Sequence, residues 1–265
     1  MKKFALLALI LCAMLVTACG TDKEKIGVIR YLNTSEESFD ASLHANKQSL
    51  NHEHVFFENL PTMVESLQAG HIDAISTYES VATYLVAKNP DMYFHITDPV
   101  VRDIFCFAMR DNEAALQKEF NSAIFRISKS GKLAQIVKKY IDDFNRAEEP
   151  PAVEMPTFIG KPTIKIGVTG DLPLIDYIRP DGQPAGFNTA VLAEISRIIE
   201  KNFVLVQIDS GARSVALSSG RIDVIFWAVA PKADSVAPEN FDKPEKMIFT
   251  KSYFADDIVH VHMKK

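Results

Sequence analysis

The residues best placed for chemistry are polar and aromatic side chains that directly follow short apolar segments. Asp171 comes just after the apolar segment 164–168, and Trp227, the single tryptophan, follows the segment 224–226. Ligands of open α/β sheets bind at the carboxyl ends of strands and against helix N-termini. These residues therefore predict a crevice for a small polar solute. In the N-terminal half, the same kind of position is held by Tyr31, Asn33, Thr34, Tyr78 and Glu79.

Most of these candidates also have an ordinary structural interpretation. Asp171 could hold the amino group of a ligand, or it could cap a turn or helix. Trp227 could form an aromatic wall for the ligand, or it could be a core residue whose indole N–H finds a backbone partner. Asn33 and Thr34 could present a helix N-terminus to a carboxylate, or simply cap that helix. Arg213, near the start of a predicted helix, could bind a carboxylate or be a surface charge.

Other kinds of chemistry are not indicated. His44, His52 and His54 are close in sequence, but their spacing suits a polar loop better than a zinc site. His260 and His262 alternate on an extended segment and are expected to face the same side. A nucleophile elbow and a glycine-rich phosphate loop are both missing from the sequence. We therefore predict no catalytic residues, no metal and no cofactor.

Two short sequences occur twice and indicate the domain plan. KIGV stands at residues 25–28 and again at 165–168, and LQAGHIDAI at 67–75 is echoed by LSSGRIDVI at 217–225. Each unit opens with an apolar strand and later has a helix that stops at a glycine before another strand. The stretch 147–162 holds four prolines and no periodicity, which predicts a linker. Two similar α/β lobes with a cleft between them are typical of ligand-trapping proteins.

The N-terminus predicts export. Lys2 and Lys3 precede an apolar run, 4–16, that is shorter than the ~20 residues of a membrane span, so it is typical of a signal peptide. Residues 16–19 (VTAC) resemble the bacterial lipobox, which implies cleavage after residue 18, lipid on Cys19 and a tether over 19–24. The alternative is an ordinary signal peptide with an incidental cysteine. The remaining Cys106 is expected to be a buried, inert thiol.

Composition excludes some partners and allows others. The chain has 265 residues, 47% of them hydrophobic, and a net charge of −5. That length suits one two-lobed protein or two small domains. Because there is no basic excess, no nucleic-acid partner is predicted.

Several motifs in the C-terminal half follow one another in the order found in a known family. They are GVTGDLP at 167–173, PDGQPAGF at 180–187, ALSSGRIDVI at 216–225 and SYF at 252–254. Over about 90 residues the chain resembles the family-3 solute-binding proteins, the bilobal type that binds polar amino acids. Residues 25–99 resemble the family's second lobe, and residues 100–145 resemble its C-terminal segment. Since the usual order is reversed, the chain resembles a circular permutant.

The resemblance implies an α/β, two-lobed fold of the type II periplasmic-binding-protein-like kind, each lobe being a mixed, mostly parallel sheet with flanking helices. One lobe is expected over 25–99 and the other over 100–145 plus 164–255. The linker is expected over 146–163, and 256–265 would cross between the lobes.

The implied function is a lipid-anchored, extracytoplasmic monomer that captures a small polar solute, an amino acid or a related compound, for an ABC permease. The alternatives are a prephenate-dehydratase-like enzyme on the same fold, a sensory or interaction module, and a swapped dimer in place of a single-chain permutant.

Two departures from the family concern the ligand. Ile175 stands where the family has an aromatic residue that stacks on the ligand, and Ser235 falls near the position of its carboxylate-binding arginine. A serine cannot replace the two parallel hydrogen bonds of a guanidinium, so Arg213 is the candidate substitute. The family's acid for the ligand's amino group falls at Tyr78 or Glu79.

Overall fold

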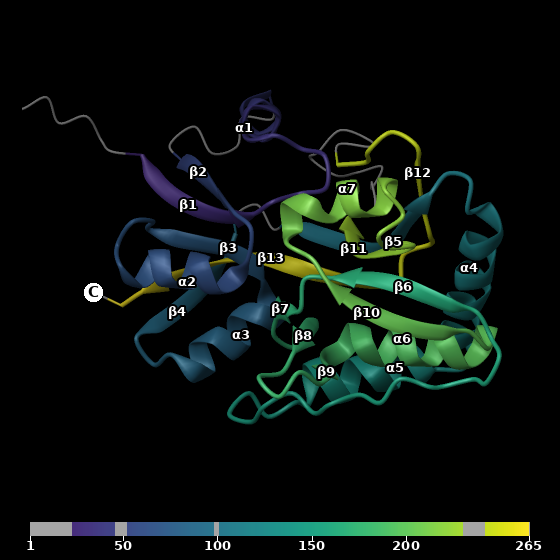
Figure 1. The fold of residues 1–265 in the computed structure, drawn as a ribbon. Coiled ribbons are helices and arrows are strands. Elements are labelled where there is room, and N and C mark those ends of the chain that lie inside the picture. Colours follow the sequence, from purple (N-terminus) through teal and green to yellow (C-terminus); the bar gives the residue numbers. More distant parts are fainter. Residues whose placement is uncertain (1–22, 46–51, 98–100, 230–241, 265) are drawn as a thin grey trace, which may run out of the picture.

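The computed structural model describes residues 23–45, 52–97, 101–229 and 242–264, so the predicted signal peptide, Cys19 and Ser235 lie outside the described residues. Within those ranges, no helix combines the length and the apolarity needed to cross a membrane. The N-terminal elements alternate between strand and helix (Figure 1). They are β1 (Glu24–Ile29), α1 (Glu36–Ala45), β2 (His52–Phe57), α2 (Leu60–Gln68), β3 (Ala74–Tyr78), α3 (Glu79–Lys88) and β4 (Met92–Ile96).

The C-terminal elements vary more in length and kind. A strand and consecutive helices come first: β5 (Arg102–Arg110), α4 (Ala114–Lys129), α5 (Lys132–Val137) and the π-helix η1 (Lys138–Asp142). After the proline-rich stretch follow β6 (Thr163–Val168), β7 (Asp171–Leu172), β8 (Asp176–Ile178), β9 (Pro184–Ala185), α6 (Gly186–Ile199) and β10 (Asn202–Gln207). The last are the 3-10 helix η2 (Ser210–Ala212), α7 (Arg213–Ser218), β11 (Val224–Val229), β12 (Met247–Phe249) and β13 (Phe254–Met263).

One mixed sheet of ten strands runs through the described part of the chain. Its order is β10-β6-β11-β5-β13-β3-β1-β2, with β12 paired to β5 and β4 paired to β13. We call β1–β4 the first half-sheet, and β5, β6, β10, β11 and β12 the second half-sheet. Strand β13 belongs to both, because residues 254–257 pair with β5 while residues 258–263 pair with β3 and β4. The α/β fold class predicted from the sequence is confirmed.

The two repeated sequences lie side by side within each half-sheet. We call KIGV (25–28 and 165–168) the first echo, and LQAGHIDAI (67–75) with LSSGRIDVI (217–225) the second echo. Strands β1 and β3 are parallel neighbours, and so are β6 and β11. A Cβ added to Gly27 would lie 2.7 Å from Ile72 Cδ1, and one added to Gly167 would lie 2.4 Å from Ile222 Cδ1. The glycine of the first echo thus makes room for the isoleucine of the second. This contact explains why the two short sequences recur together.

Residues 102–142 lie with the second half-sheet. Strand β5 pairs with β11 and β12, and helix α4 packs against α6. Phe107 of β5 stacks on Tyr253 at 4.6 Å between ring centroids and meets Phe120 of α4 at 5.3 Å. The stretch between η1 and β6 has a single bridge, from Ala152 to Ala185. It passes beside α6 and returns the chain to the sheet (Figure 1).

Three local details of the fold are not indicated by the sequence pattern. Strands β7, β8 and β9 form a small separate sheet that no pattern predicted, since strands of two or three residues are too short to show alternation. The helix that follows Gly131 changes from α-helix to π-helix at Lys138. Strand β3 begins at Ala74, and the side chain of the preceding Asp73 accepts a hydrogen bond from the Lys25 amide at the start of β1 (2.8 Å).

Candidate functional site

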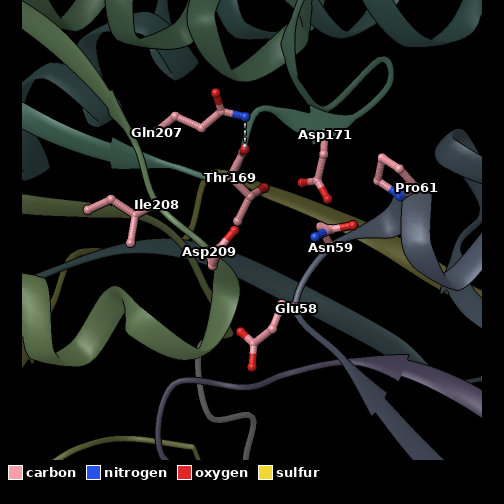
Figure 2. A pocket seen from close by; sticks show the side chains of 8 residues that line it. All are labelled: Glu58, Asn59, Pro61, Thr169, Asp171, Gln207, Ile208 and Asp209. Carbon is pink, nitrogen blue, oxygen red and sulfur yellow. Dashed lines mark hydrogen bonds between the residues drawn. The ribbon is translucent and has the colours of Figure 1, made fainter.

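A pocket of about 250 Å³ lies at the carboxyl ends of β2, β6 and β10. Because β2 belongs to the first half-sheet and the other two strands to the second, the pocket lies between the half-sheets. Figure 2 shows the residues after β2 facing those after β6 and β10. The lining residues are Glu58, Asn59, Pro61, Thr169, Asp171, Gln207, Ile208 and Asp209.

The lining is acidic. Glu58 forms an ion pair with Arg30 Nε at 2.7 Å and accepts a hydrogen bond from the Gly211 amide at 2.9 Å. Asp209 is exposed at the end of β10. Asp171, which follows β6, supplies a third carboxyl group across the pocket from Glu58. Three carboxyl groups around one small pocket favour a ligand with a positive charge.

Asp171 is held by the start of helix α2. Its Oδ2 accepts a hydrogen bond from the Leu60 amide at 2.6 Å, while its buried Oδ1 has no hydrogen-bond partner among the described residues. Burial raises the pKa of this carboxyl, and the Leu60 amide opposes the rise. Asp171 is half-buried as a residue, and this oxygen is an unused hydrogen-bond acceptor beside the pocket.

A polar and aromatic chain links the two half-sheets next to this site. The indole Nε1 of Trp227 donates to the Tyr78 hydroxyl at 2.9 Å, and that hydroxyl donates to Asp103 Oδ2 at 3.0 Å. Burial raises the pKa of Asp103 to about 6 and that of Tyr78 well above its usual value. Trp227 has a positive φ of 58°, at an irregularity in the pairing of β11 with β5. This bulge directs its ring toward the first half-sheet.

Arg213 is a buried connector and not a free clamp. Its guanidinium donates to three backbone carbonyls, those of Ser210 (2.9 Å), Trp227 (2.7 Å) and Arg30 (3.0 Å), and it stacks over the Trp227 ring at 4.4 Å. Its exposed fraction is 1%. Burial lowers its pKa to about 10, so it stays charged at neutral pH. Three of its five N–H donors bind backbone carbonyls and the side chain is buried, which leaves little capacity for a ligand carboxylate.

The amide groups that follow β1 bind a carboxylate from within the chain. Asp242 accepts hydrogen bonds from the amides of Leu32 (2.9 Å), Asn33 (2.8 Å) and Thr34 (3.1 Å). Burial raises the pKa of Asp242, and these amides oppose the rise. The amides of residues 32–34 therefore form an anion-binding loop ahead of α1, with Asp242 as the bound anion, and Asn33 and Thr34 are not at the helix N-terminus itself.

The predicted site residues divide between the pocket and its surroundings. Of the eight predicted site residues, Asp171 lines the pocket and the other seven are not among the lining residues. Tyr78, Trp227 and Arg213 meet in the layer that joins the half-sheets, and Tyr31 stacks on Phe39 at 5.4 Å. Asn33 and Thr34 present their amides to Asp242, as described above. Glu79 begins α3 and is not among the residues that line the pocket.

Sequence reasoning missed most of the lining residues. Glu58 and Asn59 directly follow β2, and Ile208 and Asp209 directly follow β10. These positions meet the same strand-end criterion that selected Asp171, so the signal was present in the sequence. Thr169 directly follows β6 and meets the same criterion. Which strand ends face each other depends on the sheet order, which the sequence did not supply.

Comparisons with known proteins give one family and several distant structures. Residues 164–263, from β6 to the end of β13, match the model of the bacterial extracellular solute-binding proteins, family 3. A search of curated proteins found no match to the chain.

Three of the solved structures that resemble the chain illustrate the range. One is the ligand-binding component of an ABC-type import system from Staphylococcus aureus with zinc bound. It is 14% identical with a TM-score of 0.48, and the match covers 91% of this chain and 66% of that one. Another is the reduced form of the OxyR regulatory domain from Pseudomonas aeruginosa, at 11% identity, 91% and 88% coverage and a TM-score of 0.41. The third is the PBP AgaA from A. tumefaciens R10 in complex with agropinic acid, at 11% identity, 80% and 55% coverage and a TM-score of 0.40.

The chain spans slightly less than two thirds of the length of the Staphylococcus aureus protein. The family match covers the strand ends that carry Thr169, Asp171 and Asp209, and so includes the second half-sheet's side of the pocket. Between β6 and β13, residues 164–263 match the model of the family 3 bacterial extracellular solute-binding proteins, and this match supports a solute-binding role.

Proposed function

We propose that the protein is an extracytoplasmic solute-binding protein that holds a small, positively charged polar solute between its half-sheets. The observation that carries the proposal is the acidic pocket at the strand ends of the segment that matches the solute-binding family. A volume of about 250 Å³ suits a ligand the size of a single amino acid or a small amine. An ABC permease is the proposed recipient.

The charges around the pocket support an amine or amino acid bound chiefly through its amino group. Glu58, Asp171 and Asp209 provide carboxyl groups, and Asp171 has an oxygen to spare. The two groups that could bind a carboxylate already have internal partners. Arg213 donates to backbone carbonyls, and the amides after β1 bind Asp242. In this proposal, Tyr78, Trp227 and Arg213 hold the half-sheets together, and Asp171 contacts the solute.

The test is a thermal-shift screen of amines, amino acids and carboxylic acids, followed by affinity measurements. Cationic solutes should raise the melting temperature, since a ligand that binds the folded state stabilises it. Asp171→Asn and Asp209→Asn should each weaken the best ligand at least tenfold, about 1.4 kcal/mol. Asp111→Asn, an exposed acid in the turn after β5, is the matched control. Stabilisation by anionic solutes alone, or equal affinities for Asp171→Asn and Asp111→Asn, would refute the assignment.

The proposal includes a lipid anchor and a permuted chain. A signal peptide over 1–18 and a lipid on Cys19 would hold the protein at the outer face of a membrane. The pairing of β5 with β11 and the packing of α4 on α6 support one lobe built from 100–145 and 164–255. Cys19→Ala should release the protein from the membrane fraction. Retention of that variant in membranes would contradict the anchor without affecting the pocket.

A further inference from the structure

The first half-sheet has a face rich in histidine. On β13, Val259 and Val261 are fully buried in the main hydrophobic core, which also contains residues of α2 and α3. The alternate residues, His260 and His262, therefore point to the opposite face. Five of the seven histidines in the chain lie on the strands of this half-sheet. They are His52 and His54 on β2, His95 on β4, and His260 and His262 on β13.

Three of these histidines converge. Strands β4 and β13 are antiparallel, and His95 is paired directly with His260. The ring of His95 also stacks on that of His262, with centroids 4.8 Å apart and an angle of 16°. One ligating nitrogen from each of His95, His260 and His262 can be chosen so that all lie within 4.8 Å of one another. The arrangement follows from sheet register, because two residues on one strand and one on its neighbour share a face.

A second observation at the cluster independently points to a ligand. The Nε2 atom of His262 is buried and has no hydrogen-bond partner among the described residues. A buried polar atom without a partner costs roughly 1–3 kcal/mol. Nearby, Glu24 Oε2 lies 3.1 Å from His52 Nε2, and Glu24 Oε1 lies 3.9 Å from His262 Nδ1. A carboxylate beside an imidazole ligand is a common way to orient it.

We propose that His95, His260 and His262 bind one divalent transition-metal ion, with zinc as the reference ion. Zinc bound by three histidines at about 2.0–2.1 Å would place the nitrogens roughly 3.3 Å apart, so the rings need to close by about 1.5 Å from their present spacing. Imidazole ligands favour zinc, copper and nickel over magnesium and calcium. The fourth position is open to water or to a neighbouring side chain. This site lies outside the pocket between the half-sheets and does not depend on it.

The test uses the full chain purified without a histidine tag and titrated with zinc by calorimetry. One zinc ion per chain should bind, and magnesium and calcium should not. His95→Ala and His262→Ala should each lower the zinc affinity at least tenfold, since each removes one of three ligands. His71→Ala is the matched control, because His71 is exposed in the turn between α2 and β3.

X-ray absorption of the zinc-loaded wild-type protein decides the case if a variant fails to fold. The expected spectrum has three imidazole nitrogens at about 2.0–2.1 Å. The proposal is overturned by the absence of zinc binding at micromolar concentration, by a spectrum with fewer than three imidazoles, or by an equal loss of affinity in His71→Ala. Solute binding in the acidic pocket should be the same in His95→Ala as in the wild type, which separates this site from the proposed function.

Discussion

Gly167→Ala tests the contact that joins the two sequence echoes. The new Cβ would lie 2.4 Å from Ile222 Cδ1, whereas carbon atoms in contact are ordinarily about 3.5–4.0 Å apart. The next nearest atoms, Ile208 Cδ1 and Ile222 Cγ2, are both at 3.5 Å and need not move. The clash therefore comes from one methyl group. Overpacking of this kind costs about 1–3 kcal/mol of unfolding free energy.

Removing that methyl group should relieve the clash. Ile222→Val alone should cost about 0.5–1.5 kcal/mol. Valine at position 222 has no Cδ1 and so leaves room for the new Cβ. The double variant Gly167→Ala/Ile222→Val should therefore be more stable, by about 1 kcal/mol or more, than the sum of the two single effects predicts. Urea unfolding of the four proteins, followed by circular dichroism, gives this coupling energy. Additive effects, within about 0.5 kcal/mol, would show that the contact does not carry the strain.

The equivalent glycine of the first half-sheet provides an internal comparison. A Cβ on Gly27 would meet Ile72 Cδ1 at 2.7 Å and also two atoms of Met63, at 2.8 and 2.9 Å. Shortening Ile72 removes one obstacle and leaves the others. Gly27→Ala should therefore be rescued much less by Ile72→Val than Gly167→Ala is by Ile222→Val.

Three further predictions concern the layer between the half-sheets. Arg213→Met should lower the unfolding free energy by about 2–5 kcal/mol, because three carbonyls lose their donor. Arg213→Lys should be destabilised as well, and urea unfolding measures the unfolding free energy of both variants. Tyr78→Phe should cost about 1–3 kcal/mol and change the emission of Trp227, whose indole N–H loses its acceptor. Since burial raises the pKa of Asp103 to about 6, the folded state binds more protons than the unfolded chain between pH 4 and 6. This group's contribution to stability therefore falls as the pH rises through that range, and Asp103→Asn should remove that part of the slope in a series of melting curves; an unchanged slope would contradict the prediction.

The sequence was informative where function depends on local pattern. The echoes at 25–28 and 165–168 located equivalent strands, and the strand-end criterion found Asp171. It was less informative where contacts join distant segments. Asp242 and the Leu32 amide are 210 residues apart, so no spacing could predict that this carboxylate occupies the amide site.

Two other features depend on sheet geometry that no single-sequence pattern encodes. The positive φ of Trp227 arises from an irregularity in the pairing of β11 with β5. The His95 side chain joins His260 and His262 only because β4 pairs with β13 in one register. The alternation of His260 and His262 was visible in the sequence, but the third ligand was not.

Strand β13 has a consequence for how the chain folds. It is synthesised after every other described strand, yet it lies between β5 and β3 in the middle of the sheet. Until it is made, β5 and β3 each have an unpaired edge, and the pairings that β13 supplies join distant parts of the chain, such as Ile258 with Tyr78. Chains dominated by such distant pairings fold slowly and expose strand edges during the process. A nascent chain lacking β13 should therefore leave the two half-sheets unjoined, so that assembly of the whole sheet waits until the last strand has been synthesised.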